Sequence, residues 1–338
     1  MSSEQYQPDG FVVATSVAPG AEKRPRPLLQ TEDAPLVVIM GPTAVGKTGL
    51  ALWLAERLDA EIVSADSRQV YRFMDIGTAK PTPQQRARIR HHLIDIVNPD
   101  ESFTLAQYQA LAYAAINDIL NRGKLPLLVG GTGLYIRAVV EGLGIPAVAP
   151  DPDLRRDLFE RAAQEGEKTF HERLQRIDPV TAERLDPRNV RRVVRALEVY
   201  LKTGRPISEQ QKRRPPPYHV LLLGLTMARE ALYERVDRRV DDMIAVGLVE
   251  EVRGLVARGY AYELPSMSGL GYQQIGLYLR GEAGLEEATR LIKRDTRRFI
   301  RHQYNWFRLS DERIRWFDAL VSPYEAIYKA ILSFCGTS

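Results

Sequence analysis

Short apolar runs and longer stretches with helical spacing alternate along the chain. Amphipathic stretches predict helices at 50–58 and at 105–120, where Ser102 or Thr104 can cap the first turn. Regular alternation of strand and helix predicts an α/β fold, a parallel sheet with helices on both faces. The apolar runs that predict buried strands lie at 36–40, 60–66, 92–97, 126–129 and 220–225.

The same pattern divides the chain into four parts. Residues 1–34 are polar and aperiodic, and we expect a disordered N-terminal tail. Residues 35–145 and 190–320 are predicted to form one core domain with C-terminal helices. The segment 146–189 is charged and helical with few large apolar residues, which predicts a small all-helical insertion. Residues 321–338 are predicted to be a C-terminal helix and tail.

The stretch after the first strand matches the pattern G-x-x-x-x-G-K-[ST]. It consists of Gly41, Pro42, Thr43, Ala44, Val45, Gly46, Lys47 and Thr48. Strand, glycine loop and helix follow in the order that a phosphate-binding P-loop requires, so we predict a P-loop NTPase-like sheet. Backbone N–H groups, the helix N-terminus and Lys47 would bind a diphosphate or polyphosphate, and the Thr48 hydroxyl suits Mg²⁺. The alternative is a glycine turn that merely precedes a helix.

One carboxylate, Asp66, is well placed for chemistry. It ends the second strand, and ligands of open α/β sheets lie beyond the carboxyl ends of strands. Later strands end in Asn98 and in Gly130-Gly131, so a second carboxylate typical of nucleotide hydrolases is missing. Asp66 could bind Mg²⁺ or accept a proton from a nucleophile, or it could simply cap a helix.

Composition limits the remaining classes. The net charge is +4, with a pI of about 9.1, which alone says little about nucleic acid. No run of eighteen apolar residues occurs, so we expect no membrane span. The single cysteine, Cys335, excludes an internal disulfide and fits a cytoplasmic protein. The five histidines lack metal-ligand spacing.

Arginines recur at helical spacing in the second half of the chain. Arg191, Arg192 and Arg195 share one predicted helix, and Arg235 and Arg239 share another. The stretch 290–301 is rich in arginine and is followed by aromatic residues. Such faces suit a nucleic-acid backbone, although a solvated helix face would look the same.

Several motifs together resemble the tRNA dimethylallyltransferase family. The resemblance covers about residues 35–310, in the family's order, and the stretch that begins Asp66-Ser67-Arg68-Gln69 is its most specific part. His302 and Gln273 depart from the family's usual basic residues. The matching stretches are 41–48, 66–71, 74–81, 130–135, 195–198, 239–243, 271–272 and 296–308.

This resemblance implies a reaction and roles for individual residues. The family transfers a dimethylallyl group from dimethylallyl diphosphate to N6 of the adenosine 3′ to the anticodon. Asp66 would be the general base. Lys47, Thr48 with Mg²⁺, and Arg239 or else Arg235 would stabilise the departing diphosphate in the loop 41–48.

The resemblance also implies contacts with tRNA. The helical insertion would bind the anticodon stem-loop, and the basic C-terminal helix would contact its backbone. We expect a monomer. The implied tRNA contacts are Asp66, Ser67, Arg68, Gln69, Thr132, Arg155, Arg191, Arg192, Val193, Val194, Arg195, Arg297 and Arg298.

Three alternatives remain open from the sequence. The same chemistry could act on free AMP, ADP or ATP, as in adenylate dimethylallyltransferases. A nucleoside or small-molecule kinase would bind ATP at the same loop. A non-catalytic RNA-binding protein would not need the intact Lys47, Thr48 and Asp66.

Overall fold

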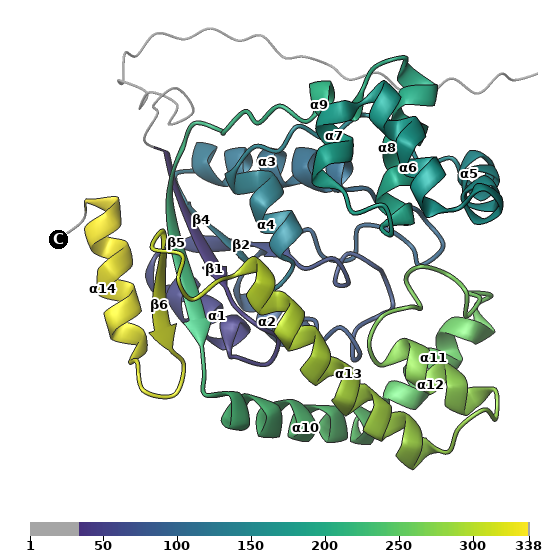
Figure 1. The fold of residues 1–338 in the computed structure, drawn as a ribbon. Helices are drawn as coiled ribbons and strands as arrows, with labels where there is room; N and C mark the ends of the chain where they lie inside the picture. The colour runs from purple at the N-terminus through teal and green to yellow at the C-terminus, as the bar shows by residue number, and fades with distance from the viewer. Residues whose placement is uncertain (1–33, 337–338) are drawn as a thin grey trace, which may run out of the picture.

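The computed structural model describes residues 34–336, so the predicted N-terminal tail lies outside them except for Ala34. Ala34 is not part of a tail, because it opens the first strand. Six parallel strands form one sheet in the order β3-β2-β4-β1-β5-β6 (Figure 1). The strands are β1 (Ala34–Met40), β2 (Ala60–Ala65), β3 (His91–His92), β4 (Leu125–Gly130), β5 (Tyr218–Thr226) and β6 (Ile314–Asp318).

Helices cover both faces of this sheet, as the alternation of strand and helix predicts. Side chains of β1 alternate between two cores: Leu36 and Val38 pack with α3 and α4, and Val37 and Ile39 pack with α1 and the C-terminal helices. Thr104, one of the two predicted caps, begins α3. These helices are α1 (Lys47–Arg57), α2 (Pro83–Arg88), α3 (Leu105–Asn121), α4 (Gly133–Val140), α10 (Arg229–Ala245), α11 (Leu248–Ala257), α12 (Tyr272–Leu279), α13 (Leu285–Trp306) and α14 (Tyr324–Cys335).

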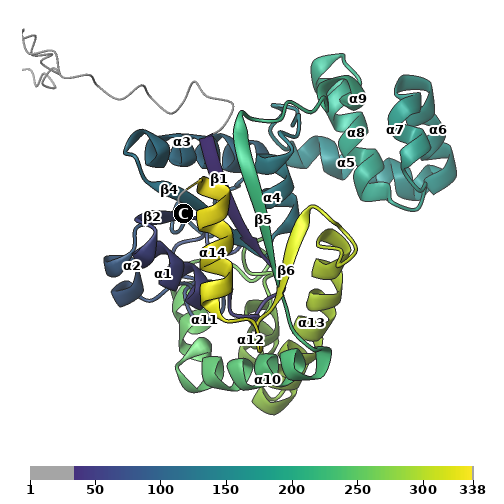
Figure 2. The same ribbon diagram turned by 90° about the vertical axis from the view of Figure 1, so that its left-hand side faces the viewer.

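The helical insertion has a hydrophobic core of its own and stands apart from the sheet (Figure 2). Its predicted end at residue 189 is wrong. Val193 and Leu197 of α8 pack with Leu158 and Phe170 of the insertion, so α8 and α9 belong to it. The insertion helices are α5 (Pro152–Glu165), α6 (Glu167–Ile177), α7 (Pro179–Arg184), α8 (Val190–Thr203) and α9 (Ile207–Gln210).

Two strand predictions differ from the structure. The predicted strand at 92–97 shrinks to β3, because Leu93 and Asp95 take positive φ angles of 63° and 58° that a strand does not allow. Asp95 instead binds Lys80 and Arg86. The edge strand β6 was not predicted, since its sequence Ile-Arg-Trp-Phe-Asp is short and lies inside a stretch interpreted as helical.

Candidate active site

Three loops leave neighbouring strands at the same edge of the sheet. Met40 of β1 and Ala65 of β2 both lie in register with Gly130 of β4. The loop 41–46, the residues from Asp66 onward and the turn at 131–132 therefore begin side by side. This is the edge at which ligands bind in open α/β sheets.

The glycine loop after β1 has the backbone geometry of a phosphate-binding loop. Gly41 has a φ of 148°, and a Cβ there would lie 2.4 Å from the carbonyl oxygen of Leu225, so only glycine fits. Gly46 caps the N-terminus of α1. Lys47 Nζ donates to the carbonyl oxygens of Gly41 at 3.0 Å and Pro42 at 2.7 Å, and these bonds hold the ammonium across the loop.

Lys47, Asp66 and Arg239 form a cluster of charges at this edge. Burial lowers the pKa of Lys47 to about 8; the Asp66 carboxylate opposes this shift and the Arg239 charge adds to it. Burial also lowers the pKa of Arg239, again opposed by Asp66. Two partly desolvated cations beside one carboxylate make a site that favours an anionic ligand.

The two carboxylate oxygens of Asp66 have different surroundings. Oδ1 accepts from the backbone N–H of Arg68 at 2.8 Å and of Gln69 at 3.4 Å, which orients the carboxylate. Among residues 34–336, no hydrogen-bond donor reaches Oδ2. No helix begins directly after Asp66, so Asp66 does not cap one; Oδ1 closes a turn, and the other oxygen is able to contact a ligand.

Two cavities meet at these charged residues. One, the P-loop cavity of about 710 Å³, lies over Thr48 and the side chains of Arg235 and Arg239. The other, of about 510 Å³, has apolar walls from Val240 and Ile292 and is called the α10–α13 cavity. The residues that line both are Thr43, Ala44, Lys47, Asp66, Thr78 and Arg239.

The structure gathers most of the predicted site residues around these cavities. Ser67, Arg68, Thr132 and Arg298 line the α10–α13 cavity, and Gln69 lines the P-loop cavity. Gly41, Pro42 and Val45 do not line either cavity. The first two supply the carbonyls that hold Lys47, and Val45 is buried in the core.

The predicted tRNA contacts in the insertion divide into three groups. Val193 and Val194 are buried in its core, so their side chains offer no exposed surface to tRNA, and contact through this stretch of α8 stays a prediction. Arg155 and Arg195 both bind the buried carboxylate of Glu198, with N–O distances of 2.8 and 2.6 Å.

The arginines Arg191 and Arg192, in the first turn of α8, are exposed. In the described part of the chain their side chains have no ion pair or hydrogen bond. On α13, Arg297 binds Asp237 and stacks over Tyr233, whereas Arg298 faces the cavity.

Sequence reasoning missed Gln303 of α13, which joins two of the three loops. Its Oε1 accepts from the backbone N–H of Thr43 at 2.9 Å, and its Nε2 donates to the carbonyl of Gly131 at 2.9 Å. Gln303 is nearly fully buried, in a helix that looks basic and solvated in the sequence. The one available signal was a neutral polar residue within the buried stripe of that helix.

The donors around the P-loop cavity fit a Mg²⁺ ion held mainly by a phosphate ligand and water. Thr48 is exposed, and its hydroxyl makes no hydrogen bond within residues 34–336. No group of three acidic, histidine or cysteine side chains that could hold a metal exists in that range. Magnesium commonly uses one or two protein oxygens together with substrate phosphates, which this donor set matches.

None of the helices in the described range has the length and apolar character needed to cross a membrane.

Comparison with known proteins assigns the chain to a family. Residues 69–310 match the family model described as IPP transferase. A tRNA dimethylallyltransferase of Roseiflexus castenholzii is 58% identical over 274 residues, which are 81% of this chain and 90% of that protein. One from Dehalococcoides mccartyi is 50% identical over 301 residues, 89% of this chain and 93% of that protein.

Solved structures agree with this result. The tRNA isopentenylpyrophosphate transferase of Bacillus halodurans is 42% identical, with a TM-score of 0.67 over 90% of this chain and 97% of its own. A eukaryotic dimethylallyltransferase acting on tRNA is 29% identical, with a TM-score of 0.71 over 85% of this chain and 74% of its own. The chain belongs to the IPP transferase family, and its sheet is P-loop NTPase-like, as predicted.

Proposed function

We propose that the protein transfers a dimethylallyl group from dimethylallyl diphosphate to N6 of the adenosine 3′-adjacent to the anticodon in tRNA, and releases diphosphate. The observation that carries the proposal is the junction of the two cavities at Asp66, Lys47 and Arg239. A phosphate-binding loop lies on one side of this junction, and an apolar-walled cavity lies on the other. Family membership makes a tRNA prenyltransferase the expected activity.

The P-loop cavity suits the diphosphate. Backbone N–H groups at the start of α1, Lys47 and Arg239 would bind its oxygens as negative charge develops on them. Mg²⁺, bound through the Thr48 hydroxyl, would supply further charge neutralisation when present. Arg235 lines only this cavity, whereas Arg239 lines both, which favours Arg239 as the residue nearest the breaking bond.

The α10–α13 cavity suits the acceptor and the five-carbon chain. Its apolar walls exclude water from the reacting carbon, which protects it from hydrolysis. The C1–O bond of the substrate breaks and its electrons leave with the diphosphate, while the N6 lone pair forms the new C–N bond. Asp66 Oδ2 accepts the proton that N6 loses. Because an exocyclic amine is a weak nucleophile, positioning should contribute more than base strength.

The tRNA would lie against α13, the loop after Asp66 and the insertion. The target base must leave its stack to reach the cavity, as in other enzymes that act on a base. Ser67, Arg68, Thr132 and Arg298 line this cavity, and Arg191 and Arg192 are exposed basic groups on the insertion. A free mononucleotide would not need the insertion, which favours tRNA over AMP. We further propose that the protein works as a monomer in the cytoplasm.

A labelling experiment tests this function and its alternatives together. Labelled dimethylallyl diphosphate is incubated with unmodified bulk tRNA, AMP, ADP or ATP, with and without Mg²⁺. We expect label in tRNA only, and dependence on Mg²⁺. Label in the mononucleotides alone would identify an adenylate dimethylallyltransferase, and phosphate transfer from ATP without prenyl transfer would identify a kinase.

A further inference from the structure

The turn of residues 74–80 forms a wall of both cavities. Gly77 and Thr78 line the α10–α13 cavity, and Thr78 and Ala79 line the P-loop cavity. Phe73 and Ala79, at either end of the turn, have positive φ angles of 65° and 48°. Left-handed non-glycine residues persist only where the surroundings hold them, so this turn needs support from other parts of the fold.

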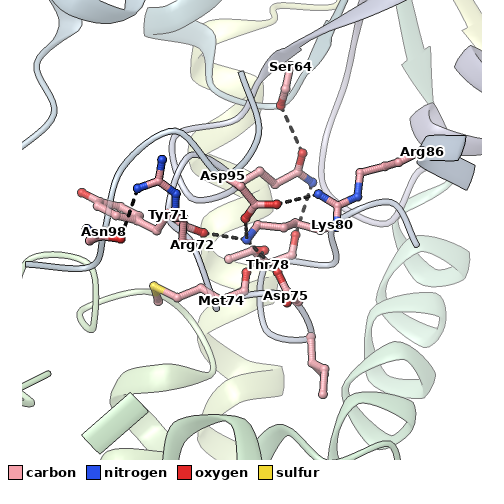
Figure 3. A network of polar contacts seen from close by, with 12 residues as sticks. Ser64, Tyr71, Arg72, Met74, Asp75, Thr78, Lys80, Arg86, Asp95 and Asn98 are labelled. Atoms are coloured by element: carbon pink, nitrogen blue, oxygen red, sulfur yellow. Dashed lines mark hydrogen bonds and ion pairs between the residues drawn. The ribbon is translucent and has the colours of Figure 1, made fainter. Parts of the chain in front are cut away.

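One support is the network of polar contacts around Lys80, the last residue of this turn (Figure 3). The buried Lys80 ammonium donates to the Tyr71 carbonyl at 2.6 Å, to Asp75 at 2.7 Å and to Asp95 at 2.6 Å. Asp95 in turn binds Arg86 at 2.5 Å. This network fixes Lys80 and Asp75 of the turn to each other and to the segment around Asp95.

The other support is Glu251 of α11, which is about 175 residues further along the chain. One carboxylate oxygen, Oε2, accepts from the backbone N–H groups of Asp75 at 2.8 Å and Ile76 at 2.7 Å. The second, Oε1, accepts from the N–H of Gly77 at 3.1 Å. Three consecutive N–H groups, which have no partner inside a single turn, are thus bound by one carboxylate.

Tyr272 of α12 completes this contact. Its hydroxyl donates to Glu251 Oε1 at 2.6 Å, and burial together with the Glu251 charge raises its pKa well above the usual value, which keeps it a donor. Its ring packs against Gly77, where a Cβ would lie 2.5 Å from a ring carbon. Both oxygens of Glu251 therefore carry two hydrogen bonds each.

The turn is linked to Asp66 through Gln69. Gln69 Nε2 donates to the carbonyls of Thr78 and Ala79, each at 3.4 Å. Its backbone N–H donates to Asp66 Oδ1. A shift of the turn would therefore move the residue that helps to orient the Asp66 carboxylate.

We propose that Glu251 is a positioning residue for the transfer reaction, because it holds the turn 74–80 and, through Gln69, the loop that carries Asp66. The inference rests on the proposed function. It depends on the acceptor chemistry of a carboxylate, because all four groups that face Glu251 are donors. A glutamine side chain has the same shape, but its NH₂ group would face hydrogen-bond donors and could not accept from them.

The test compares Glu251→Gln and Glu251→Asp with the matched control Glu250→Gln. Glu250 precedes Glu251 on α11, is 68% exposed and pairs only weakly with Arg253 at 3.4 Å. Steady-state transfer to tRNA gives kcat and both KM values. Circular dichroism and the stoichiometry of tRNA binding give the folded, binding-competent fraction of each variant.

We expect Glu251→Gln to lower kcat by about 10- to 100-fold per binding-competent site, with both KM values within about threefold. Glu251→Asp keeps the acceptor-only chemistry and should retain a higher kcat than Gln, although Gln is the closer match in size. Tyr272→Phe removes one of the four donors to Glu251 and should lower kcat by about two- to fivefold. If Glu251→Gln does not fold, Tyr272→Phe is the variant that tests the inference.

Other outcomes would overturn the inference. A Glu251→Gln variant that matches Glu250→Gln in kcat per competent site would do so, as would a higher kcat for Gln than for Asp. A loss confined to the KM for tRNA would make Glu251 part of tRNA binding instead. If the unaltered protein transfers no dimethylallyl group, the proposed function itself fails. If the unaltered protein is active and substitution of Glu251 does not change its activity, only this inference fails.

Discussion

Gln303 accepts a hydrogen bond from the backbone N–H of Thr43 across 260 residues of sequence, at 2.9 Å. The contact joins the long C-terminal helix α13 to the P-loop. Because the same side chain donates to Gly131, one residue connects two of the loops that build the site. The face of α13 that lines the α10–α13 cavity and the diphosphate-binding loop are therefore parts of one rigid arrangement.

Replacing Gln303 should weaken diphosphate binding. Gln303→Ala leaves the Thr43 N–H and the Gly131 carbonyl without their partner, at a cost of about 1–3 kcal/mol for each buried group. We expect the Kd of inorganic pyrophosphate, measured by calorimetry with Mg²⁺, to rise by about 10-fold. Asn305→Ala, at an exposed position of the same helix, is the control and should leave the Kd unchanged. Equal Kd values for both variants would contradict the coupling.

Arg239 and Arg235 should differ in their effects on catalysis. Arg239 lines both cavities, so Arg239→Gln should lower kcat by about 10²- to 10³-fold through lost stabilisation of the departing diphosphate. Arg235 lines the P-loop cavity only, and Arg235→Gln should act mainly on the KM for dimethylallyl diphosphate. Steady-state kinetics of both variants decide the assignment. A larger loss of kcat in Arg235→Gln would reverse it.

Arg298 should contribute to the salt dependence of tRNA binding. It is exposed at the α10–α13 cavity and makes no ion pair within residues 34–336. Arg298→Ala should reduce the magnitude of the slope of log K against log salt by the amount that corresponds to the loss of about one phosphate contact. Arg290→Ala removes a guanidinium that already pairs with Glu287 and should change the slope little. If the two variants have the same slope, Arg298 belongs to a solvated helix face.

Stability should fall in acid through Glu61, far from the site. Arg122 binds its carboxylate through two nitrogens, and with His92 holds the pKa of Glu61 down to about 2. A carboxyl whose pKa is lowered by folding stabilises the protein above its unfolded pKa of 4.5 and loses this contribution as the pH falls toward 2.

Urea unfolding at pH 7 and pH 4 measures this effect. Between these values the parent should lose about 1 kcal/mol more unfolding free energy than Glu61→Gln, which cannot titrate at this position. Equal losses in the two proteins would show that Glu61 does not carry the dependence.

Much of the fold and the site follows from local sequence patterns. The P-loop, Asp66 and the pair Arg235/Arg239 lie in contiguous motifs whose strand and helix flanks are readable from spacing. Contacts between distant segments are not readable in this way. Glu251 and Gln303 act on backbone N–H groups, and nothing in the sequence near Asp75 or Thr43 indicates which distant side chain will bind there.

The incorrect predictions have a similar cause. The buried stripe of α8 predicts a packed helix, but it does not say whether the sheet or the insertion supplies the partner. Asp95 lies in an apolar run that predicts a strand, and its ion pairs with Lys80 and Arg86 hold it in a turn instead. The sequence also does not show that Arg155 and Arg195 share a buried ion-pair partner, Glu198, and their contact with tRNA stays a prediction.

The central claim is that Asp66 accepts the proton of an adenine amine during dimethylallyl transfer to tRNA. Asp66→Asn keeps the Oδ1 acceptor that orients the side chain and removes the carboxylate at Oδ2. Single-turnover transfer to a synthetic anticodon stem-loop, followed by mass spectrometry of its nucleosides, measures the claim directly.

We predict one dimethylallyl group on the adenosine 3′ to the anticodon and none when inosine replaces it. For Asp66→Asn we predict a rate lower by about 10²- to 10⁴-fold with equal or tighter pyrophosphate binding. Transfer to the inosine stem-loop, or an unchanged rate for Asp66→Asn, would contradict the account.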